Sequence, residues 1–165
     1  MYMSKQVKKK SQKQENQVAF DLGGKVTIAS GALYFQKADV RTDKYLVECK
    51  YTDKGFYSLT TKTWEKIRSE AIKDGLRIPV MQIELYGGVH SFAVMDINDF
   101  EAEFEESKYT SELEDTIETS NKSFRITGEI VSKSLSVEQI HYTLVHVGKY
   151  SLAVLLWDDM ILLNN

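Results

Sequence analysis

Three charged residues in one short segment have the types and the spacing to bind a divalent cation. Asp39 precedes a run dense in strand-forming residues, Tyr45–Tyr51, and this run contains Glu48 and Lys50. Side chains alternate between the two faces of a strand, so Glu48 and Lys50 point to the same side. Burying an acidic and a basic side chain on an apolar strand costs free energy, so their presence there suggests a functional site. The simpler alternative to a functional site is an ion pair on the surface of an edge strand.

A two-residue turn at Asp43-Lys44 would bring the carboxylates of Asp39 and Glu48 together. In that hairpin the two residues face each other directly, with Cβ atoms roughly 4.5–5.5 Å apart. Two carboxylates at this separation repel each other, and a divalent cation between them removes the repulsion. The spacing therefore predicts a site for a hard metal ion with an ammonium group alongside, while Val47 and Cys49 turn into a core.

The pattern resembles the nuclease superfamily named for its PD-(D/E)xK motif, with Ala38-Asp39 in place of Pro-Asp and Glu48-Cys49-Lys50 as the (D/E)xK element. The residue before Asp39 is thus alanine where the motif has proline. Roughly from residue 10 to residue 100, the flanking segments are similar in order and spacing to the Holliday-junction-resolvase-like nucleases of phages, which are related to the archaeal junction resolvases. These segments are 13–24 and 29–32 upstream, and 58–59, 64–72 and 78–84 downstream.

The resemblance implies hydrolysis of DNA phosphodiester bonds with Mg²⁺, for which Mn²⁺ would substitute. Asp39 and Glu48 would bind the metal through carboxylate oxygens. The backbone carbonyl of Cys49 would join them, as would Glu15, which matches the acid on the family's first helix. Waters would fill the rest of the shell. Such an ion acidifies its bound water and acts as a Lewis acid toward the phosphate.

The resemblance also suggests roles for two further residues. Lys50 is expected to orient or deprotonate the attacking water, or to stabilise the pentacovalent oxyanion. Ser30 matches a serine that some relatives use near the scissile phosphate. Trp64 is expected to pack in the core. Gln82 lies on the strand that follows the helix of Trp64, and its side chain could either face the site or lie on the surface.

Branched DNA is the substrate that the resemblance implies, with resolution of four-way junctions in phage recombination or replication as the function. Such junctions have two-fold symmetry, so a resolvase is expected to be a homodimer that presents two sites. The alternatives are a nuclease of the same superfamily that acts on flaps, nicks or duplex ends, and a catalytically inactive DNA-binding or assembly module. A ribonuclease-H-like resolvase is disfavoured because it would carry a carboxylate tetrad without the adjacent lysine.

Length and composition indicate a soluble protein with one main core. The chain has 165 residues, a net charge of −3 and one cysteine. No apolar run approaches the ~20 residues of a membrane span, and the first residues lack the apolar part of a secretory signal. A single cysteine cannot form an internal disulfide, which predicts a cytoplasmic protein, in the host cytoplasm if phage-encoded. The three histidines show no ligand spacing.

Positive charge is concentrated at the start of the chain. Residues 1–14 carry five lysines and no acid, whereas residues 96–118 carry ten acids and one lysine. A local basic arm can contact phosphates although the whole chain is acidic, and a solvated tail is the alternative. The candidate DNA contacts are Lys8, Lys9, Lys10 and Lys13.

Hydrophobic periodicity predicts alternating helices and strands. A first helix is expected over 11–22, ended by Gly23-Gly24, and a second over 60–75, ended by Gly75. The apolar face of the second helix would consist of Trp64, Ile67, Ala71 and Ile72. Strands are expected at 26–29, 79–85 and 91–95 beside the 37–50 hairpin, with an acidic helix over 96–106. This pattern predicts an α/β fold, a mixed central sheet flanked by helices with a restriction-endonuclease-like core.

The domain organisation predicted from the sequence has three parts. Residues 1–106 form the nuclease core with its basic N-terminal arm, 107–120 form an acidic and polar linker or loop, and 121–165 form a small α/β C-terminal extension. Residues 54–59 are similar in sequence to residues 122–126, and residues 88–100 are similar to residues 148–160. This internal similarity indicates a partial duplication that lacks the 39–50 hairpin. The alternative is a chance similarity between two apolar hairpins.

Overall fold

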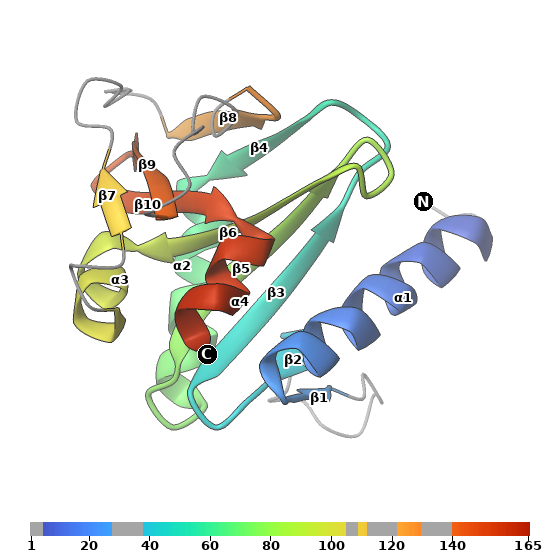
Figure 1. Ribbon diagram of the computed structural model, residues 1–165, viewed down its shortest axis with the longest axis horizontal. Helices are drawn as coiled ribbons and strands as arrows, with labels where there is room; N and C mark the ends of the chain where they lie inside the picture. Colours follow the sequence, from blue (N-terminus) through green and yellow to red (C-terminus); the bar gives the residue numbers. More distant parts are fainter. Residues whose placement is uncertain (1–4, 28–37, 105–108, 112–121, 130–139) are drawn as a thin grey trace.

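A mixed β-sheet forms the centre of the fold, with helices packed on both of its faces (Figure 1). The computed structural model describes residues 5–27, 38–104, 109–111, 122–129 and 140–165. The helices are α1 (Lys5–Leu22), α2 (Thr61–Lys73), α3 (Ile97–Glu103) and α4 (Trp157–Asn164). The strands are β1 (Lys25–Val26), β2 (Val40–Arg41), β3 (Tyr45–Tyr51), β4 (Phe56–Thr60), β5 (Ile78–Leu85), β6 (His90–Asp96), β7 (Tyr109–Ser111), β8 (Ser123–Thr127), β9 (Ile140–Val147) and β10 (Tyr150–Leu156). This architecture is the mixed α/β class that the sequence predicts.

The strand order of the main sheet, within the described ranges, is β1-β2-β3-β5-β6-β10-β9-β7. Two neighbouring pairs are parallel, β3 with β5 and β7 with β9, and the remaining pairs are antiparallel. The crossover between the parallel strands β3 and β5 contains α2, as expected for a βαβ connection. Strands β4 and β8 pair with each other in a separate two-stranded sheet.

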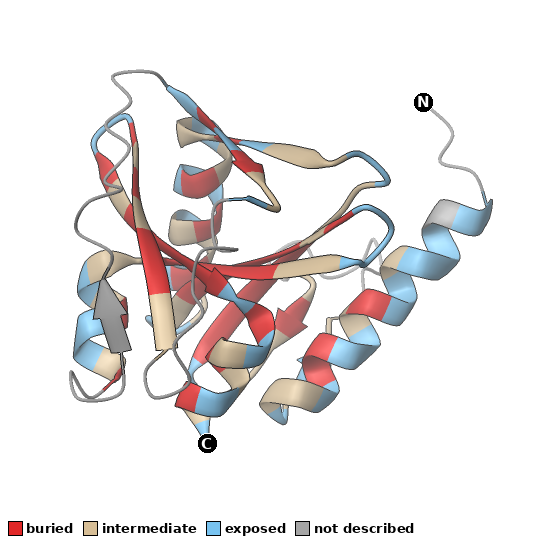
Figure 2. Cartoon of the chain, turned by 45° about the horizontal axis from the view of Figure 1, so that its top comes forward, coloured by how far each residue is buried: buried red, intermediate tan, exposed pale blue. Residues whose placement is uncertain are grey.

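Alternation along the strands divides the core between the two faces of the sheet. On one face, Val47, Ala93 and Ala153 pack with residues of α1, α3 and α4. On the other face, Val94 and Val154 pack with residues of α2 and of the β4–β8 pair. Figure 2 shows the buried residues running along the strands of the sheet, while much of α1 faces outward and is exposed.

Helix α1 ends where the sequence predicts but begins earlier. Gly23 has φ +66°, and Gly24 donates a backbone hydrogen bond to the Ala19 carbonyl over 2.7 Å, which closes the helix. Its first residue is Lys5 rather than a residue near position 11. The lysines that the sequence assigned to an arm therefore lie on the first turns of a helix.

Helix α2 confirms most of the predicted pattern. Thr60 caps it through a hydrogen bond from the Thr63 N–H to the Thr60 hydroxyl, and Trp64, Ile67 and Ala71 are buried. Ile72, which the sequence placed on the same apolar face, is 58% exposed, and that part of the prediction is wrong. The buried stripe at positions 64, 67 and 71 is narrow, so the next position turns toward solvent.

The remaining predicted elements are present with shifted bounds. Strands β5 and β6 are joined by a turn in which Gly87 and Gly88 have positive φ, and Asp96 caps α3. Tyr109–Ser111, inside the expected linker, forms β7, and the 121–165 segment contributes β9 and β10 to the same sheet as β3. In the described part of the chain, no helix is both long and apolar enough to cross a membrane.

Candidate active site

The β2–β3 hairpin has the predicted two-residue turn and the predicted register as far as Val40. Val40 pairs with Val47 and Arg41 with Leu46, and the Thr42 N–H donates to the Tyr45 carbonyl over 2.9 Å, so Asp43 and Lys44 form the turn. The regular pairing does not continue to Asp39 and Glu48, because Asp39 and Val40 both lie against Val47, as in a β-bulge. The Asp39 N–H donates to the Val47 carbonyl over 3.1 Å, which holds Asp39 beside the strand although β2 itself has ended.

The Asp39 side chain replaces a backbone partner of β3. Its Oδ2 accepts a hydrogen bond from the Cys49 N–H over 2.7 Å. The N–H and C=O of one residue in an antiparallel ladder point to the same edge, so the Cys49 carbonyl points toward the side of β3 where Asp39 lies. Burial, followed by the nearby carboxylates, raises the pKa of the Cys49 thiol. The thiol therefore stays neutral, and the carbonyl is the oxygen donor that Cys49 offers.

Glu48 and Lys50 form an ion pair in which one carboxylate oxygen remains free. Lys50 Nζ lies 2.8 Å from Glu48 Oε1. Glu48 is only 6% exposed, which excludes the surface ion pair considered above. The other oxygen, Oε2, is buried and has no hydrogen-bond partner among the described residues. An unpartnered carboxylate oxygen inside a protein is unfavourable unless another group binds it, and a cation satisfies it directly.

The carboxylates of Glu15, Asp39 and Glu48 lie close enough to repel one another. Burial, then the charge of Glu48, raises the pKa of Asp39 to about 7, although the Cys49 N–H and Lys50 oppose the shift. Burial, then Glu48, raises the pKa of Glu15, against a hydrogen bond from Ser11. Clusters of carboxylates with raised pKa values are typical of functional sites.

Lys50 stays cationic in this surrounding. Burial by itself would lower the pKa of Lys50, but the hydrogen bond and the charge of Glu48 outweigh that effect and raise it. Tyr57 of β4, in the two-stranded sheet, also reaches the site, because its phenol group interacts electrostatically with Lys50 and burial raises its own pKa. The sequence pattern of β4 offered no indication of this placement.

Helix α1 is attached to the site strands through two buried amides. Gln14 is 3% exposed and donates from Nε2 to the Lys50 carbonyl over 3.0 Å and to Gln82 Oε1. Gln82 is 1% exposed and donates to Ser91 Oγ over 2.6 Å. Gln82 therefore does not lie on the surface, which was one of the two positions left open for it, but is buried beneath α1.

Gln14 was not recognised from the sequence, although its spacing contained a clue. It lies four residues before the buried Val18 and therefore on the buried face of α1. Glu15, the next residue, is half-buried and within electrostatic reach of Asp39 and Glu48. The Gln14 amide thus sets where α1 lies on β3, and the position of Glu15 follows from it.

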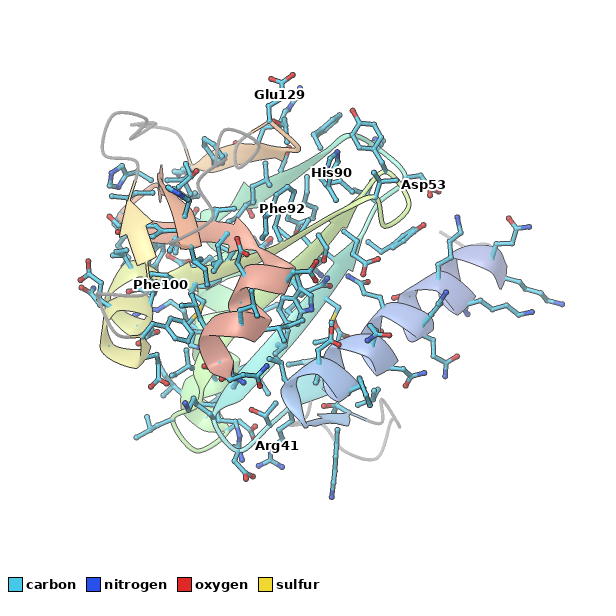
Figure 3. The ribbon with its side chains drawn as sticks, in the orientation of Figure 1. Arg41, Asp53, His90, Phe92, Phe100 and Glu129 are labelled. Carbon is cyan, nitrogen blue, oxygen red and sulfur yellow. The ribbon has the colours of Figure 1, made fainter. Side chains whose placement is uncertain are left out.

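The four candidate lysines all lie on the first half of α1 and are exposed. Lys10 lies 3.6 Å from Asp53 and 5.6 Å from the centre of the Tyr51 ring, so it is held at the end of β3. Figure 3 shows α1 running alongside the sheet edge between the levels of Arg41 and Asp53. The lysines therefore lie on the same helix as Glu15, near the C-terminal end of β3.

The donor set fits a hard cation that retains much of its water. Within the described ranges, no group of three or more His, Cys, Asp or Glu side chains is arranged as a complete metal cluster. The available donors are the Asp39 carboxylate, the free oxygen of Glu48 and the Cys49 carbonyl, with Glu15 nearby. Mg²⁺ usually takes only one or two protein carboxylates and keeps several waters, so this set suits it. Ser30 lies outside the described residues.

Comparisons with known proteins reveal a likeness in fold to a solved structure. No protein family profile matches the sequence, and no curated protein sequence matches it. The fold is similar to that of Hjc from Archaeoglobus fulgidus, a Holliday junction resolvase from an archaeal hyperthermophile. The TM-score is 0.44 and the identity 13%, over 76% of this chain and 94% of Hjc.

Proposed function

We propose that this protein is a metal-dependent DNA endonuclease that hydrolyses phosphodiester bonds in branched DNA, with the four-way junction as its substrate. The observation that carries the proposal is the buried, unpartnered Oε2 of Glu48. It lies on the carboxylate that pairs with the Lys50 ammonium, and Asp39 is held within electrostatic reach of Glu48 by the hydrogen bond that its carboxylate accepts from the Cys49 N–H. The resemblance of the 39–50 segment to the PD-(D/E)xK motif supports the assignment to nucleases.

In this proposal Asp39, Glu48 and the Cys49 carbonyl hold a Mg²⁺ ion, and Glu15 completes the negative surroundings. The ion would supply an acidified water and charge relief at the phosphate. Lys50 is held by Glu48 Oε1 at 2.8 Å, so its ammonium is directed at the site before substrate arrives. From there it would orient the attacking water or stabilise the charge that develops on the phosphoryl oxygens.

Substrate binding would use the exposed lysines of α1. Lys8, Lys9, Lys10 and Lys13 lie on the helix that carries Glu15, so a phosphate backbone crossing the site would pass near them. A four-way junction presents two equivalent strands, and complete resolution requires two cuts. Two copies of the chain would supply the two sites.

Cleavage of a substrate panel tests the proposal. The purified protein is incubated with labelled four-way junction, flap, nicked and linear duplex DNA, in Mg²⁺ and in excess chelator. We expect cuts in the junction that need Mg²⁺, and none with Glu48→Gln, whose amide preserves the shape but weakens the metal site. Equal cutting of linear duplex would indicate a less selective nuclease. Binding without any cutting would indicate an inactive DNA-binding module, and cutting in chelator would refute the metal site.

A further inference from the structure

The two-stranded ribbon of β4 and β8 has one face in the core and the other toward solvent. Leu59, Phe124 and Ile126 are buried in the cluster that includes residues of α2 and the main sheet, and Tyr57 packs against this cluster. Side chains alternate along both strands, so the remaining residues point outward. The outward positions are Phe56, Ser58 and Thr60 on β4, and Ser123, Arg125 and Thr127 on β8.

The outer face of the ribbon carries positive charge, hydroxyl groups and one aromatic ring. Neither β4 nor β8 contains an acidic residue. The Arg125 guanidinium lies 4.2 Å from the centre of the Phe56 ring, and the Lys54 ammonium lies 5.7 Å from the same centre. The ring thus holds two cations on one surface. The acids Asp53 and Glu129 lie in the turns beyond one end of the ribbon (Figure 3).

The same end of the ribbon packs on two rings of the β5–β6 hairpin. Gly55 precedes β4 and Gly128 follows β8, so the two glycines are neighbours at the end of the ladder. A Cβ on Gly55 would overlap the Tyr86 ring, and a Cβ on Gly128 would lie 2.9 Å from the His90 ring. The glycines therefore let the ribbon backbone lie close against these rings, which fixes the position of its outer face before a ligand binds.

The ribbon lies next to the candidate active site, on the face of the main sheet opposite α1. Tyr57 points inward from β4, and its phenol interacts electrostatically with Lys50. Glu48 and Lys50 alternate along β3 with Val47 and Cys49, which belong to the cluster on the α1 face. A strand of nucleic acid bound at the site would therefore have α1 on one side and the ribbon on the other (Figure 1).

The residue types of the outer face suit the sugar–phosphate backbone of a nucleic acid. Arginine, lysine, serine and threonine are among the residues that contact phosphate oxygens. The residues that read the edges of adenine and cytosine, namely asparagine, glutamine, aspartate and glutamate, do not occur in β4 or β8. Five residues of an antiparallel strand extend over roughly 17 Å, which is about the rise of five base pairs. The ribbon is thus long enough to contact several consecutive phosphates.

We propose that the outer face of the β4–β8 ribbon binds the phosphate backbone of duplex DNA beside the cleavage site, through Arg125, Lys54 and the hydroxyl groups of Ser58, Ser123 and Thr127. The contact is independent of base sequence and holds one duplex arm on the side of the site opposite α1. Its role in cleavage rests on the proposed nuclease function, whereas the binding of DNA by the ribbon does not.

Binding by a protein that is unable to cut tests this proposal. Glu48→Gln protein is titrated with labelled four-way junction in chelator, with and without the further substitutions Lys54→Gln and Arg125→Gln. Loss of two phosphate contacts should lower the slope of log affinity against log salt by about 1.8, so the advantage of the parent protein should shrink roughly tenfold between about 50 and about 200 mM salt. The matched control is Lys66→Gln with Lys73→Gln, two exposed lysines of α2, which should leave the slope unchanged.

A second variant adds an acid to the outer face without removing a cation. Ser58 pairs with Arg125, so a glutamate at position 58 would neutralise the guanidinium and repel a phosphate. Ser58→Glu should weaken junction binding roughly tenfold, whereas Ser69→Glu, at an exposed serine of α2, should have little effect. Ser58 is exposed, so its substitution should leave the free energy of unfolding nearly unchanged.

The opposite results would overturn the proposal. Equal salt slopes for the parent and the Lys54→Gln, Arg125→Gln protein would exclude the ribbon as a phosphate contact, as would equal effects of Ser58→Glu and Ser69→Glu. A loss of affinity confined to particular arm sequences would also overturn it, because phosphate contacts carry no sequence information. If the slopes change as expected but the wild-type protein cuts no DNA, the proposed nuclease is refuted and the ribbon remains a DNA-binding surface.

Discussion

Replacing Asp39 with asparagine tests the carboxylate cluster without relying on activity. Burial and the neighbouring Glu48 raise the pKa of Asp39 from 3.8 to about 7. The folded protein without metal therefore holds a proton on Asp39 at pH values where the unfolded chain has lost it. Asparagine keeps a side-chain oxygen that can accept the hydrogen bond from the Cys49 N–H but carries no charge. We expect Asp39→Asn to be more stable than the wild type when no metal is present.

The sign and size of this effect follow from proton linkage. Between pH 4 and pH 7 the folded state binds more protons at Asp39 than the unfolded state, so the free energy of unfolding of the wild type falls as pH rises. A pKa raised from 3.8 to about 7 corresponds to about 4 kcal/mol above pH 7. Asp39 is half-buried, so solvent screening reduces this to about 2–4 kcal/mol. The advantage of Asp39→Asn should thus be small near pH 4.5 and largest at pH 8.

Denaturant unfolding in chelator, followed by the fluorescence of the buried Trp64 and Trp157, measures the difference at both pH values. Asp53→Asn is the matched control, because Asp53 is exposed and should give no pH-dependent gain. Added Mg²⁺ should stabilise the wild type and not Asp39→Asn. An Asp39→Asn protein that is less stable than the wild type at pH 8, or equally stabilised at both pH values, would refute the cluster as described.

Three further substitutions test the site and the DNA contacts. Lys50→Met should lower turnover by roughly 10²–10⁴-fold with little change in Mg²⁺ affinity, and unchanged turnover at saturating Mg²⁺ would exclude a catalytic role. Gln14→Leu removes two buried hydrogen bonds, so unfolding free energy should fall by about 1–3 kcal/mol, and the Mg²⁺ concentration for half-maximal cleavage should rise because Glu15 is displaced. An unaltered Mg²⁺ requirement would mean that Gln14 does not position Glu15. Replacing Lys8 and Lys9 together by glutamine should make the salt dependence of junction binding shallower, by about 0.9 per lost phosphate contact, whereas exposed Lys62→Gln on α2 should not. Equal slopes for both variants would exclude these two lysines as contacts.

Local sequence determined the hairpin and much of the core. The run of strand formers at Tyr45–Tyr51 and the two-residue turn before it set the register, since side chains alternate strictly along a strand and a two-residue turn allows one pairing. They do not fix Asp39, whose N–H bonds to the Val47 carbonyl and whose carboxylate accepts from the Cys49 N–H, rather than standing in a regular pair with Glu48. Glycines 23 and 75 ended α1 and α2 as predicted, because glycine readily adopts the positive φ found there.

Tertiary structure decided how deep the groups lie and which distant segments meet. Gln82 is buried because α1 packs on that face of the sheet and Gln14 supplies its partner, 68 positions away in the chain. Ile72 is exposed because the neighbours of α2 cover only part of its apolar stripe. Val94 pairs with Val154, which joins two segments of similar sequence. Their similarity could be seen in the sequence, but it did not predict that the two segments would be neighbours in the sheet. Burial and contact between distant residues arise when the whole chain packs together, and local periodicity cannot specify them.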